Sequence, residues 1–355
     1  MTRGGIRPAV LGAAGYIGQE FARMLADHPR FETPVLLGSD RSAGLRLADV
    51  WRLSEPCPPE LAALRLRRAS AGAAARLANV AFGALPTGVA GPMESELSRR
   101  GVAVFSNASD HRLEPGHPTI VPEVNASYLR LLPRRGDGPA PIVTNPNCSA
   151  TGLALALAPV FSLLRPRAVH VATYQSLSGA GFPGVPSLSI TDNVVPFIPG
   201  EEEKIASEVA WLLGRVRADR VVPSTVPIVP HCVRVGVREG HLEAVTVEAQ
   251  ARPERADLLR AWREFDPLHE LDLPTAPHPT VELRSESDRP QPLADRWAGA
   301  QRARGMAAVV GRVRWKPPFL RFFVLSHNAV RGGAGGSILN AELALAQGYW
   351  GPSHG

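Results

Sequence analysis

Short apolar runs alternate with helical patterns in the first part of the chain. An apolar run at residues 8–11 begins with Pro8 and is followed by a helical pattern over about residues 19–26. Further apolar runs stand at 34–37, 80–84 and 102–105. A helical stretch near 93–100 lies between the last two of these runs. Strands that alternate with helices predict a parallel sheet with helices on its faces, the α/β class.

The later part of the chain has a different pattern. A strand at 141–144 leads into an apolar helix over about 150–163, and the proline-rich segment 272–292 is expected to be a loop. Strand-like alternation follows at 168–175, 232–237, 243–249 and 307–315. These segments predict a mixed sheet of α+β type. A last apolar helix is expected over about 336–346.

A polar stretch rich in glycine and proline at 131–140 separates the two patterns. The expected division is a Rossmann-type dinucleotide-binding domain over 1–145, completed by the C-terminal helical segment 331–355, and a second domain over 146–330. The length of 355 residues suits two domains, and 45% hydrophobic residues are enough for two cores.

Composition argues against several function classes. No run of 18 uncharged apolar residues occurs, so no membrane span is expected. The N-terminal residues lack an apolar signal-peptide core, and a cytoplasmic location is expected. The net charge of +6 comes from basic residues spread along the whole chain, whereas nucleic-acid binding requires a basic patch. We therefore expect a small-molecule substrate, and neither nucleic acid nor a membrane as partner.

The glycine-rich segment after the first apolar run predicts a dinucleotide site. Gly12, Gly15 and Gly18 stand between a strand and a helix, together with Tyr16 and Ile17. Glycines let the backbone approach a pyrophosphate, which the helix N-terminus attracts. The alternative is an ordinary tight turn.

The segment after the second apolar run bears on cofactor choice. Arg41 can bind a 2′-phosphate, and the hydroxyls of Ser39 and Ser42 can donate to it, which predicts NADP. Asp40 keeps NAD open as the alternative, and a plain polar turn is a third interpretation.

Cys148 is the candidate nucleophile. It follows Asn147 at the junction of a strand and a helix, where the helix N-terminus stabilises a thiolate. A buried, inert thiol is the alternative, and Cys57 and Cys232 fit that description. Three scattered cysteines suggest neither a disulfide framework nor a zinc site, so no metal is expected.

Other residues with suitable chemistry lie near expected strand and helix ends. If 232–237 is a strand, residues 234 and 238 share a face, and His241 follows the next turn as a candidate acid or base. Glu201 and Lys204 begin a probable helix, although acids in a first helical turn are often only solvated. A small-residue loop at 175–181 suits close approach of a ligand.

At these positions the chain resembles aspartate-semialdehyde dehydrogenases, in particular the branch typical of archaea and fungi. The resemblance covers nearly the whole chain. The matching motifs are 12–18, 39–44, 84–94, 106–109, 121–125, 144–148, 178–193, 200–204, Arg234 with His241, and 326–328. Together these motifs are far more specific than the glycine pattern alone.

The resemblance implies a reaction and a role for each matching residue. It implies that a cysteine, here Cys148, attacks 4-aspartyl phosphate and releases phosphate, and that NADPH reduces the thioester to L-aspartate 4-semialdehyde. The implied catalytic residues are Cys148, His241 as acid or base, and Gln175. The implied substrate contacts are Arg234, Glu201, Arg112, Asn147 and Lys204. The implied nicotinamide contacts are Ser178, Gly179 and Asn328.

The resemblance also implies a homodimer or homotetramer formed through the catalytic domains, and a place in aspartate-family amino-acid biosynthesis. One alternative is a related reductase of another activated acid, such as malonyl-CoA. N-acetylglutamyl phosphate is disfavoured because that family resembles Asn-Pro-Gly-Cys at the nucleophile. An inactive dinucleotide-binding regulator conflicts with the joint presence of Cys148, Gln175, Arg234 and His241.

Overall fold

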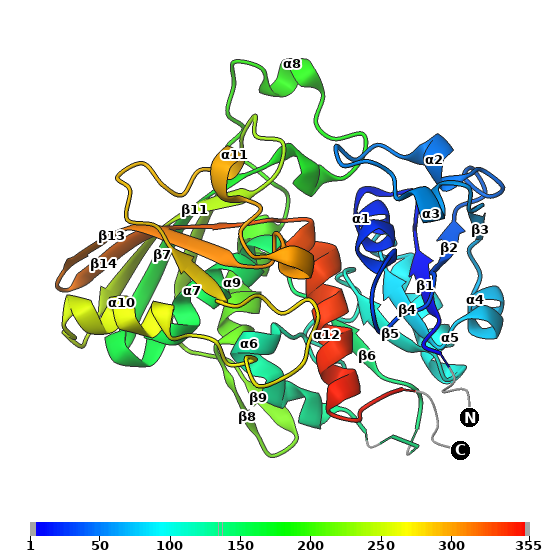
Figure 1. Ribbon diagram of the computed structural model, residues 1–355. Helices are drawn as coiled ribbons and strands as arrows, with labels where there is room; N and C mark the ends of the chain where they lie inside the picture. Colours follow the sequence, from blue (N-terminus) through cyan, green and yellow to red (C-terminus); the bar gives the residue numbers. More distant parts are fainter. Residues whose placement is uncertain (1–4, 134, 137, 352–355) are drawn as a thin grey trace. The chain divides into compact units, whose positions relative to one another are not determined.

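The computed structural model describes residues 5–133, 135–136 and 138–351, and the chain forms two compact units (Figure 1). The first unit comprises Met1–Ile120, Ser127–Asn145 and Gly333–Gly355. The second unit comprises Val121–Ala126 and Pro146–Gly332. Parts of the expected break at 131–140 and of the expected C-terminal segment 331–355 lie outside the described residues.

The first unit is built on a parallel six-stranded sheet with the strand order β3-β2-β1-β4-β5-β6. This order, with the reversal beside the first strand, is that of dinucleotide-binding folds. Pro8 is the first residue of β1. The strands are β1 (Pro8–Leu11), β2 (Val35–Gly38), β3 (Arg67–Arg68), β4 (Val80–Gly83), β5 (Ala103–Ser106) and β6 (Ile142–Thr144). The predicted α/β sheet is confirmed.

Helices cover both faces of this sheet because its central strands are apolar throughout. Helices α4 (Ala71–Leu77) and α5 (Ala90–Arg99) bury Ala74 and Leu97 on one face. On the other face Phe82 and Phe105 pack against Phe21 of α1 (Tyr16–Leu25) and Trp350. Helix α12 (Gly335–Ala346) contacts β5 and α1. The short helices α2 (Leu47–Val50) and α3 (Pro59–Ala62) follow β2.

The second unit contains a mixed six-stranded sheet in the order β10-β7-β11-β14-β13-β12. Its strands are β7 (Pro166–Gln175), β10 (Ile228–Arg234), β11 (His241–Ala249), β12 (Val281–Leu283), β13 (Ala308–Lys316) and β14 (Phe319–Ser326). The pairs β7–β10 and β12–β13 are parallel and the other neighbours are antiparallel. The predicted mixed sheet is confirmed. A separate hairpin joins β8 (Arg215–Arg217) and β9 (Arg220–Val222).

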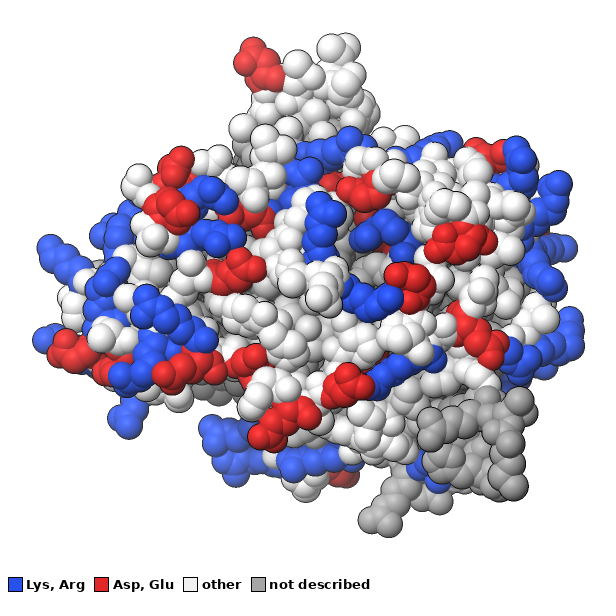
Figure 2. Space-filling model, viewed as in Figure 1, with Lys and Arg blue, Asp and Glu red and all other residues white. Residues whose placement is uncertain are grey.

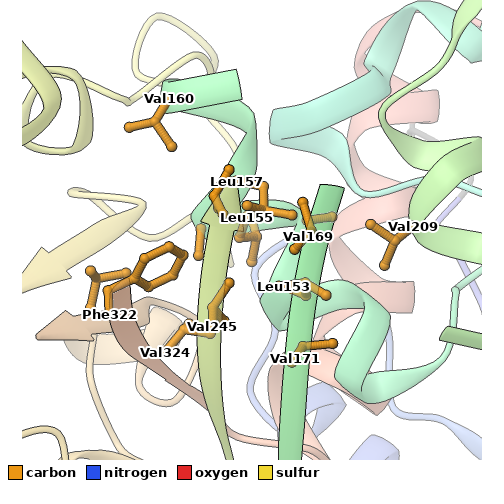
Figure 3. Close-up of a cluster of buried hydrophobic side chains, with 14 of the residues drawn as sticks. Leu153, Leu155, Leu157, Val160, Val169, Val171, Val209, Val245, Phe322 and Val324 are labelled. Atoms are coloured by element: carbon orange, nitrogen blue, oxygen red, sulfur yellow. The ribbon is translucent and has the colours of Figure 1, made fainter. Parts of the chain in front are cut away.

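One face of the mixed sheet packs under α7 (Cys148–Leu164), α9 (Glu201–Leu212) and α10 (Arg255–Arg263). Figure 3 shows Leu153 of α7 beside Val169 and Val171 of β7, in one buried cluster that also includes Leu157, Val245 and Phe322. Helix α7 is apolar nearly all round, as expected for a helix that is buried on most sides. The packing of α7 therefore holds its first residue, Cys148, in position.

The remaining helical segments are short. They are α6 (Pro122–Asn125), α8 (Ser187–Ile190) and α11 (Pro292–Asp295), the 3-10 turns Ala126–Leu131, Leu177–Ala180 and Gln301–Ala303, and a π-type turn over Val330–Ala334. Among the described residues, no helix is both long and apolar enough to span a bilayer.

Three details of the sequence prediction need correction. The expected strand 232–237 ends at Arg234, because the chain turns there and the N–H groups of Leu177 and Ser178 bond to the carbonyls of Val237 and Arg238. Positions 234 and 238 therefore share no strand. The expected loop 272–292 contains β12, whose three residues are too few to give an alternation signal. Strand β14 was not singled out.

A buried ion pair fixes the short segment 121–126 within the second unit. The guanidinium of Arg331 donates to the carboxylate of Glu123, with Nη1 at 3.0 Å from Oε1 and Nη2 at 2.5 Å from Oε2. Both side chains are almost fully buried. This two-bond geometry is the strongest form of the contact.

Candidate active site

Cys148 is the first residue of α7, and Asn147 caps that helix. The Asn147 side-chain oxygen accepts hydrogen bonds from the backbone N–H groups of Ser149 at 2.9 Å and Ala150 at 3.1 Å. The thiol is half-buried and forms no disulfide. The positive end of the helix dipole stabilises negative charge on the sulfur at this position.

Glu201 joins two other predicted residues into one buried cluster. Its Oε1 accepts hydrogen bonds from Asn147 Nδ2 at 2.9 Å and from Gln175 Nε2 at 3.0 Å. Glu208, two turns further along α9, accepts the backbone N–H of Asn147 at 2.5 Å. The first turns of α7 and α9 and the end of β7 are thereby held together.

His241 is the first residue of β11 and is fully buried. Its Nδ1 accepts the backbone N–H of Ser176 at 3.1 Å, so the proton of the neutral ring is on Nε2. Nε2 is buried and has no hydrogen-bond partner among the described residues. Burial, aided by the nearby charge of Arg234, lowers the pKa of His241 to about 3. The ring is therefore neutral near pH 7 and presents an N–H donor.

Arg234 is the last residue of β10 and lies beside this histidine. Its Nη1 donates to the Ser176 carbonyl at 2.7 Å. Burial lowers the pKa of the Arg234 guanidinium, while the negative charges of Cys148 and Glu201 oppose that shift. The cation therefore stands close enough to both groups to stabilise negative charge on them.

The residues predicted to contact the nicotinamide end of the cofactor lie close to Arg234, Gly240 and His241. Asn328 Oδ1 accepts the N–H of Gly240 at 2.9 Å, and Asn328 Nδ2 donates to Ser178 Oγ at 2.8 Å. A side chain at Gly179 would place its Cβ 2.7 Å from Arg234 Nη1 and 3.1 Å from His241 Cε1. Glycine at this position therefore permits the loop to approach both functional groups.

The predicted dinucleotide segment of the first unit has the expected local geometry. Gly12 has a φ of +82°, and Gly15 precedes α1 as its N-cap. The backbone N–H groups of Gly12 and Ala13 bond to the Leu37 carbonyl at 2.9 Å each. Tyr16, Ile17 and Gly18 form the first turn of α1, whose N-terminal N–H groups are the type that bind phosphate.

The segment after β2 carries the residues predicted to select the cofactor. Ser39 and Arg41 are exposed, whereas Ser42 is buried and donates its hydroxyl to the Ser39 carbonyl at 3.2 Å. Asp40 forms an exposed ion pair with Arg68, with 2.7 Å between Oδ1 and Nε. Arg68 is thus a second cation next to the segment that contains Arg41, and it partly neutralises the negative charge of Asp40.

Two predicted phosphate contacts are placed in different units. Arg112 lies in the first unit and donates to the Asn107 carbonyl at 2.6 Å. Lys204 lies in the second unit, exposed on the first turn of α9, one turn after Glu201. The cluster that the second unit brings together consists of Cys148, Asn147, Gln175, Glu201, Arg234 and His241.

Two further polar residues of this region were given no individual role from the sequence, although Ser176 lies in the expected ligand loop 175–181. Ser176 supplies the N–H that fixes the His241 tautomer and the carbonyl that holds Arg234. Glu243, two residues after His241, is fully buried on the same face of β11, and burial raises the pKa of its carboxyl well above the ordinary value. An acid at an inward position of an alternating strand is a detectable signal.

Comparisons with known proteins establish the family. Residues 7–131 match the model described as semialdehyde dehydrogenase, NAD binding domain, and residues 157–331 match semialdehyde dehydrogenase, dimerisation domain. An aspartate-semialdehyde dehydrogenase of Archaeoglobus fulgidus is 42% identical over 95% of this chain and 97% of its own length. The chain belongs to the aspartate-semialdehyde dehydrogenase family. It is a nicotinamide-cofactor-dependent oxidoreductase.

Other relatives show the range of this family. A crystal structure described as aspartate semialdehyde dehydrogenase with NADP from Candida albicans has a TM-score of 0.87 and 33% identity, covering 98% of this chain and 100% of that chain. A malonyl-CoA reductase (NADP) of Metallosphaera sedula is 35% identical over 97% of this chain and 98% of its own length. An aspartate-semialdehyde dehydrogenase fold is therefore shared by enzymes named for two substrates.

Proposed function

We propose that the protein catalyses the NADPH-dependent reductive dephosphorylation of L-4-aspartyl phosphate to L-aspartate 4-semialdehyde, in the cytoplasm and in aspartate-family amino-acid biosynthesis. The observation that carries the proposal is that a buried carboxylate, Glu201, and a buried guanidinium, Arg234, both lie close to the start of α7, where Cys148 stands. An amino-acid substrate has an ammonium group and a carboxylate, and these two residues complement both.

Arg234 is the proposed contact of the substrate α-carboxylate, because a guanidinium offers several N–H donors in one plane. One of them is bound to Ser176, which fixes the direction of the others. Glu201 is the proposed contact of the α-ammonium group. Arg112, Lys204 and the second N–H of Asn147 Nδ2 are the proposed phosphate contacts, and Gln175 orients the acyl group.

In the first step the thiolate of Cys148 attacks the acyl carbon of the phosphoanhydride. A carbon–sulfur bond forms, the carbon–oxygen bond to phosphate breaks, and phosphate leaves with the electron pair. The helix terminus and Arg234 stabilise the thiolate. His241 is neutral with its proton on Nε2, so its role is to donate a hydrogen bond to the oxyanion that develops on the acyl oxygen.

In the second step the thioester carbon is reduced. NADPH supplies a hydride to that carbon when it is bound beside the site. The Nε2–H of His241 again stabilises the negative oxygen, and breakage of the carbon–sulfur bond then releases the aldehyde and restores the thiolate. Ser178, Gly179 and Asn328 are the proposed contacts of the nicotinamide end.

The proposed cofactor site uses residues 12–18 for the pyrophosphate and Arg41, with Ser39 and Ser42, for the 2′-phosphate. We assign the first unit the role of the NADP-binding domain and the second unit that of the catalytic and dimerisation domain. Arg41→Ala is expected to raise the KM for NADPH about ten- to a hundredfold with kcat nearly unchanged, since an arginine–phosphate contact of this kind contributes roughly 1.5–3 kcal/mol.

The deciding test measures oxidation of L-aspartate semialdehyde in phosphate, with NADP and separately with NAD. The proposal requires phosphate-dependent turnover with NADP. Malonyl-CoA reduction is measured in parallel, because the Metallosphaera relative is named for that reaction. Glu201→Gln is expected to abolish most turnover of the amino-acid substrate. Faster reduction of malonyl-CoA than of aspartyl phosphate, unaffected by Glu201→Gln, would favour the second function.

We further propose a homodimer formed through the face of the mixed sheet opposite α7. This face exposes apolar side chains, including Tyr174, Val229 and Phe319, that are 38–45% accessible in the isolated chain. Exposed apolar side chains on one face of a sheet favour an interaction site there. Tyr174→Asp is expected to yield monomers in light scattering, whereas His269→Ala, an exposed substitution away from this sheet, leaves the dimer intact. A monomeric unsubstituted protein would refute the proposal.

A further inference from the structure

Three potential metal ligands converge in the loop that follows β5, outside the proposed catalytic residues. His111, Glu114 and His117 are spaced three residues apart, and one ligand atom of each lies within 4.8 Å of those of the other two. The backbone has positive φ angles at Leu113, +60°, and at Gly116, +81°. These two reversals within one short loop bring the three side chains to the same side.

Both ring nitrogens of His111 have partners in the structure, and Nε2 lies near the Ser95 hydroxyl at 3.4 Å as well as near a backbone carbonyl. Its Nε2 lies 3.3 Å from the Gly91 carbonyl oxygen, to which an Nε2–H can donate. Its Nδ1 donates to Glu114 Oε2 at 2.9 Å, and a metal ion would take the place of the proton shared by these two groups. A metal-bound histidine commonly donates its other ring N–H to a backbone carbonyl, which fixes the tautomer and aims the remaining nitrogen at the metal.

His117 supplies a second, independent observation. Its Nδ1 is buried and has no hydrogen-bond partner among the described residues. The ring centroid lies 4.8 Å from that of His111. A buried polar nitrogen without a partner is unfavourable, and a cation between the two rings would supply the missing partner.

We propose that His111, Glu114 and His117 form a binding site for a divalent transition metal, with Zn²⁺ as the preferred ion. Two imidazoles and one carboxylate form a ligand set typical of zinc, whereas Ca²⁺ and Mg²⁺ prefer all-oxygen sites. The side chain of Glu114 is 50% exposed, so it can rotate onto the metal and a water can complete the coordination. The prediction that the chain has no metal site considered only its cysteines.

The test uses the full-length protein after treatment with a chelator, with its thiols blocked by iodoacetamide so that they cannot bind metal. Co²⁺ is the spectroscopic probe, and Zn²⁺ is measured by calorimetry. We expect one Co²⁺ per chain with the visible absorption of a low-symmetry site, displaced by Zn²⁺. His117→Ala and Glu114→Gln are each expected to weaken binding at least about tenfold.

His269→Ala is the matched control, because this exposed histidine also stands beside a glutamate, Glu270, at 3.9 Å. It is expected to leave the affinity unchanged. Circular dichroism verifies that each variant is folded, and the exposed Glu114→Gln keeps the test valid if His117→Ala unfolds. Absence of a one-to-one complex in the blocked protein, or unchanged binding in the folded Glu114→Gln variant, would overturn the proposal.

Discussion

The second unit places two cysteines in opposite chemical environments. Cys148 is half-buried at the N-terminus of a 17-residue helix, next to the charge of Arg234. Cys232 is 2% exposed within β10, and burial raises the pKa of its thiol to about 12. The same residue type is therefore a candidate nucleophile in one place and an apolar core residue in the other.

The difference between the two thiols comes from backbone position. The first turn of a helix leaves free N–H groups whose partial positive charge lies at the helix start, whereas Cys232 lies within the edge strand β10 with its side chain in the core. The N–H of Cys232 donates to Glu202 at 2.9 Å, and acidic groups near its thiol further disfavour the thiolate. Reactivity in this protein thus depends on where a cysteine lies on its element.

The largest expected effect follows from removing the reactive thiol. Cys148→Ser should lower kcat on the order of 10⁴-fold or more, because a serine hydroxyl at a helix terminus without a base is a poor nucleophile. A steady-state assay of phosphate-dependent NADP reduction measures this effect. Iodoacetamide should inactivate the unsubstituted enzyme, and aspartate semialdehyde should protect it. Retention of more than a tenth of the activity by the serine variant would remove Cys148 from the mechanism.

The His241→Asn substitution tests the comparison of the two cysteines, because it changes a group proposed to act with Cys148 and leaves Cys232 in place. Asparagine can still accept the Ser176 N–H but cannot present a donor at the Nε2 position. We expect a 10²–10⁴-fold lower kcat, in the range of a positioned acid or base, with a small change in KM. Unchanged kcat in a correctly folded variant would contradict the donor role.

The same residue gives a pH-dependent effect on stability. The folded-state pKa of His241, about 3, lies below the ordinary histidine value of 6.5, so the unfolded chain takes up a proton that the folded protein excludes. The folded state therefore loses stability as pH falls from about 6.5 towards 3, by about 2 kcal/mol at pH 5. Urea denaturation at pH 7 and pH 5 should show a smaller difference in His241→Asn than in the unsubstituted protein.

The smallest expected effect concerns the other thiol. Cys232→Ala should cost about 1 kcal/mol of stability and leave kcat within a factor of two, because the side chain only fills space in the core. Thermal unfolding and the standard assay measure both quantities. A loss of activity comparable to that of Cys148→Ser would mean that the two environments are not functionally distinct.

Much of the fold could be predicted because periodic patterns and glycines act locally. The parallel sheet, the helix after Cys148 and the mixed sheet all follow from alternation and turn residues. The end of β10 at Arg234 could not be predicted, because it depends on backbone bonds from the distant residues Leu177 and Ser178. Strand β12 was missed because three paired residues leave no periodic signal.

The candidate site was less accessible from the sequence alone. Residue types and the family resemblance pointed to Cys148, Arg234 and His241, and the structure places these residues in one cluster. The tautomer of His241 depends on the backbone of Ser176, and the hydrogen-bonding role of Asn147 depends on Glu201 and Glu208. Such contacts join positions far apart in the chain and have no local pattern.

The ion pair between Glu123 and Arg331 has a practical consequence for dissecting this dehydrogenase. A truncated polypeptide covering only 146–332 would keep the arginine and lose the carboxylate, which belongs to the segment 121–126. An interior cation stripped of its counter-ion is destabilising by roughly 3–5 kcal/mol. Expression of the catalytic half by itself should therefore require that short segment to be grafted back, for example through a linker.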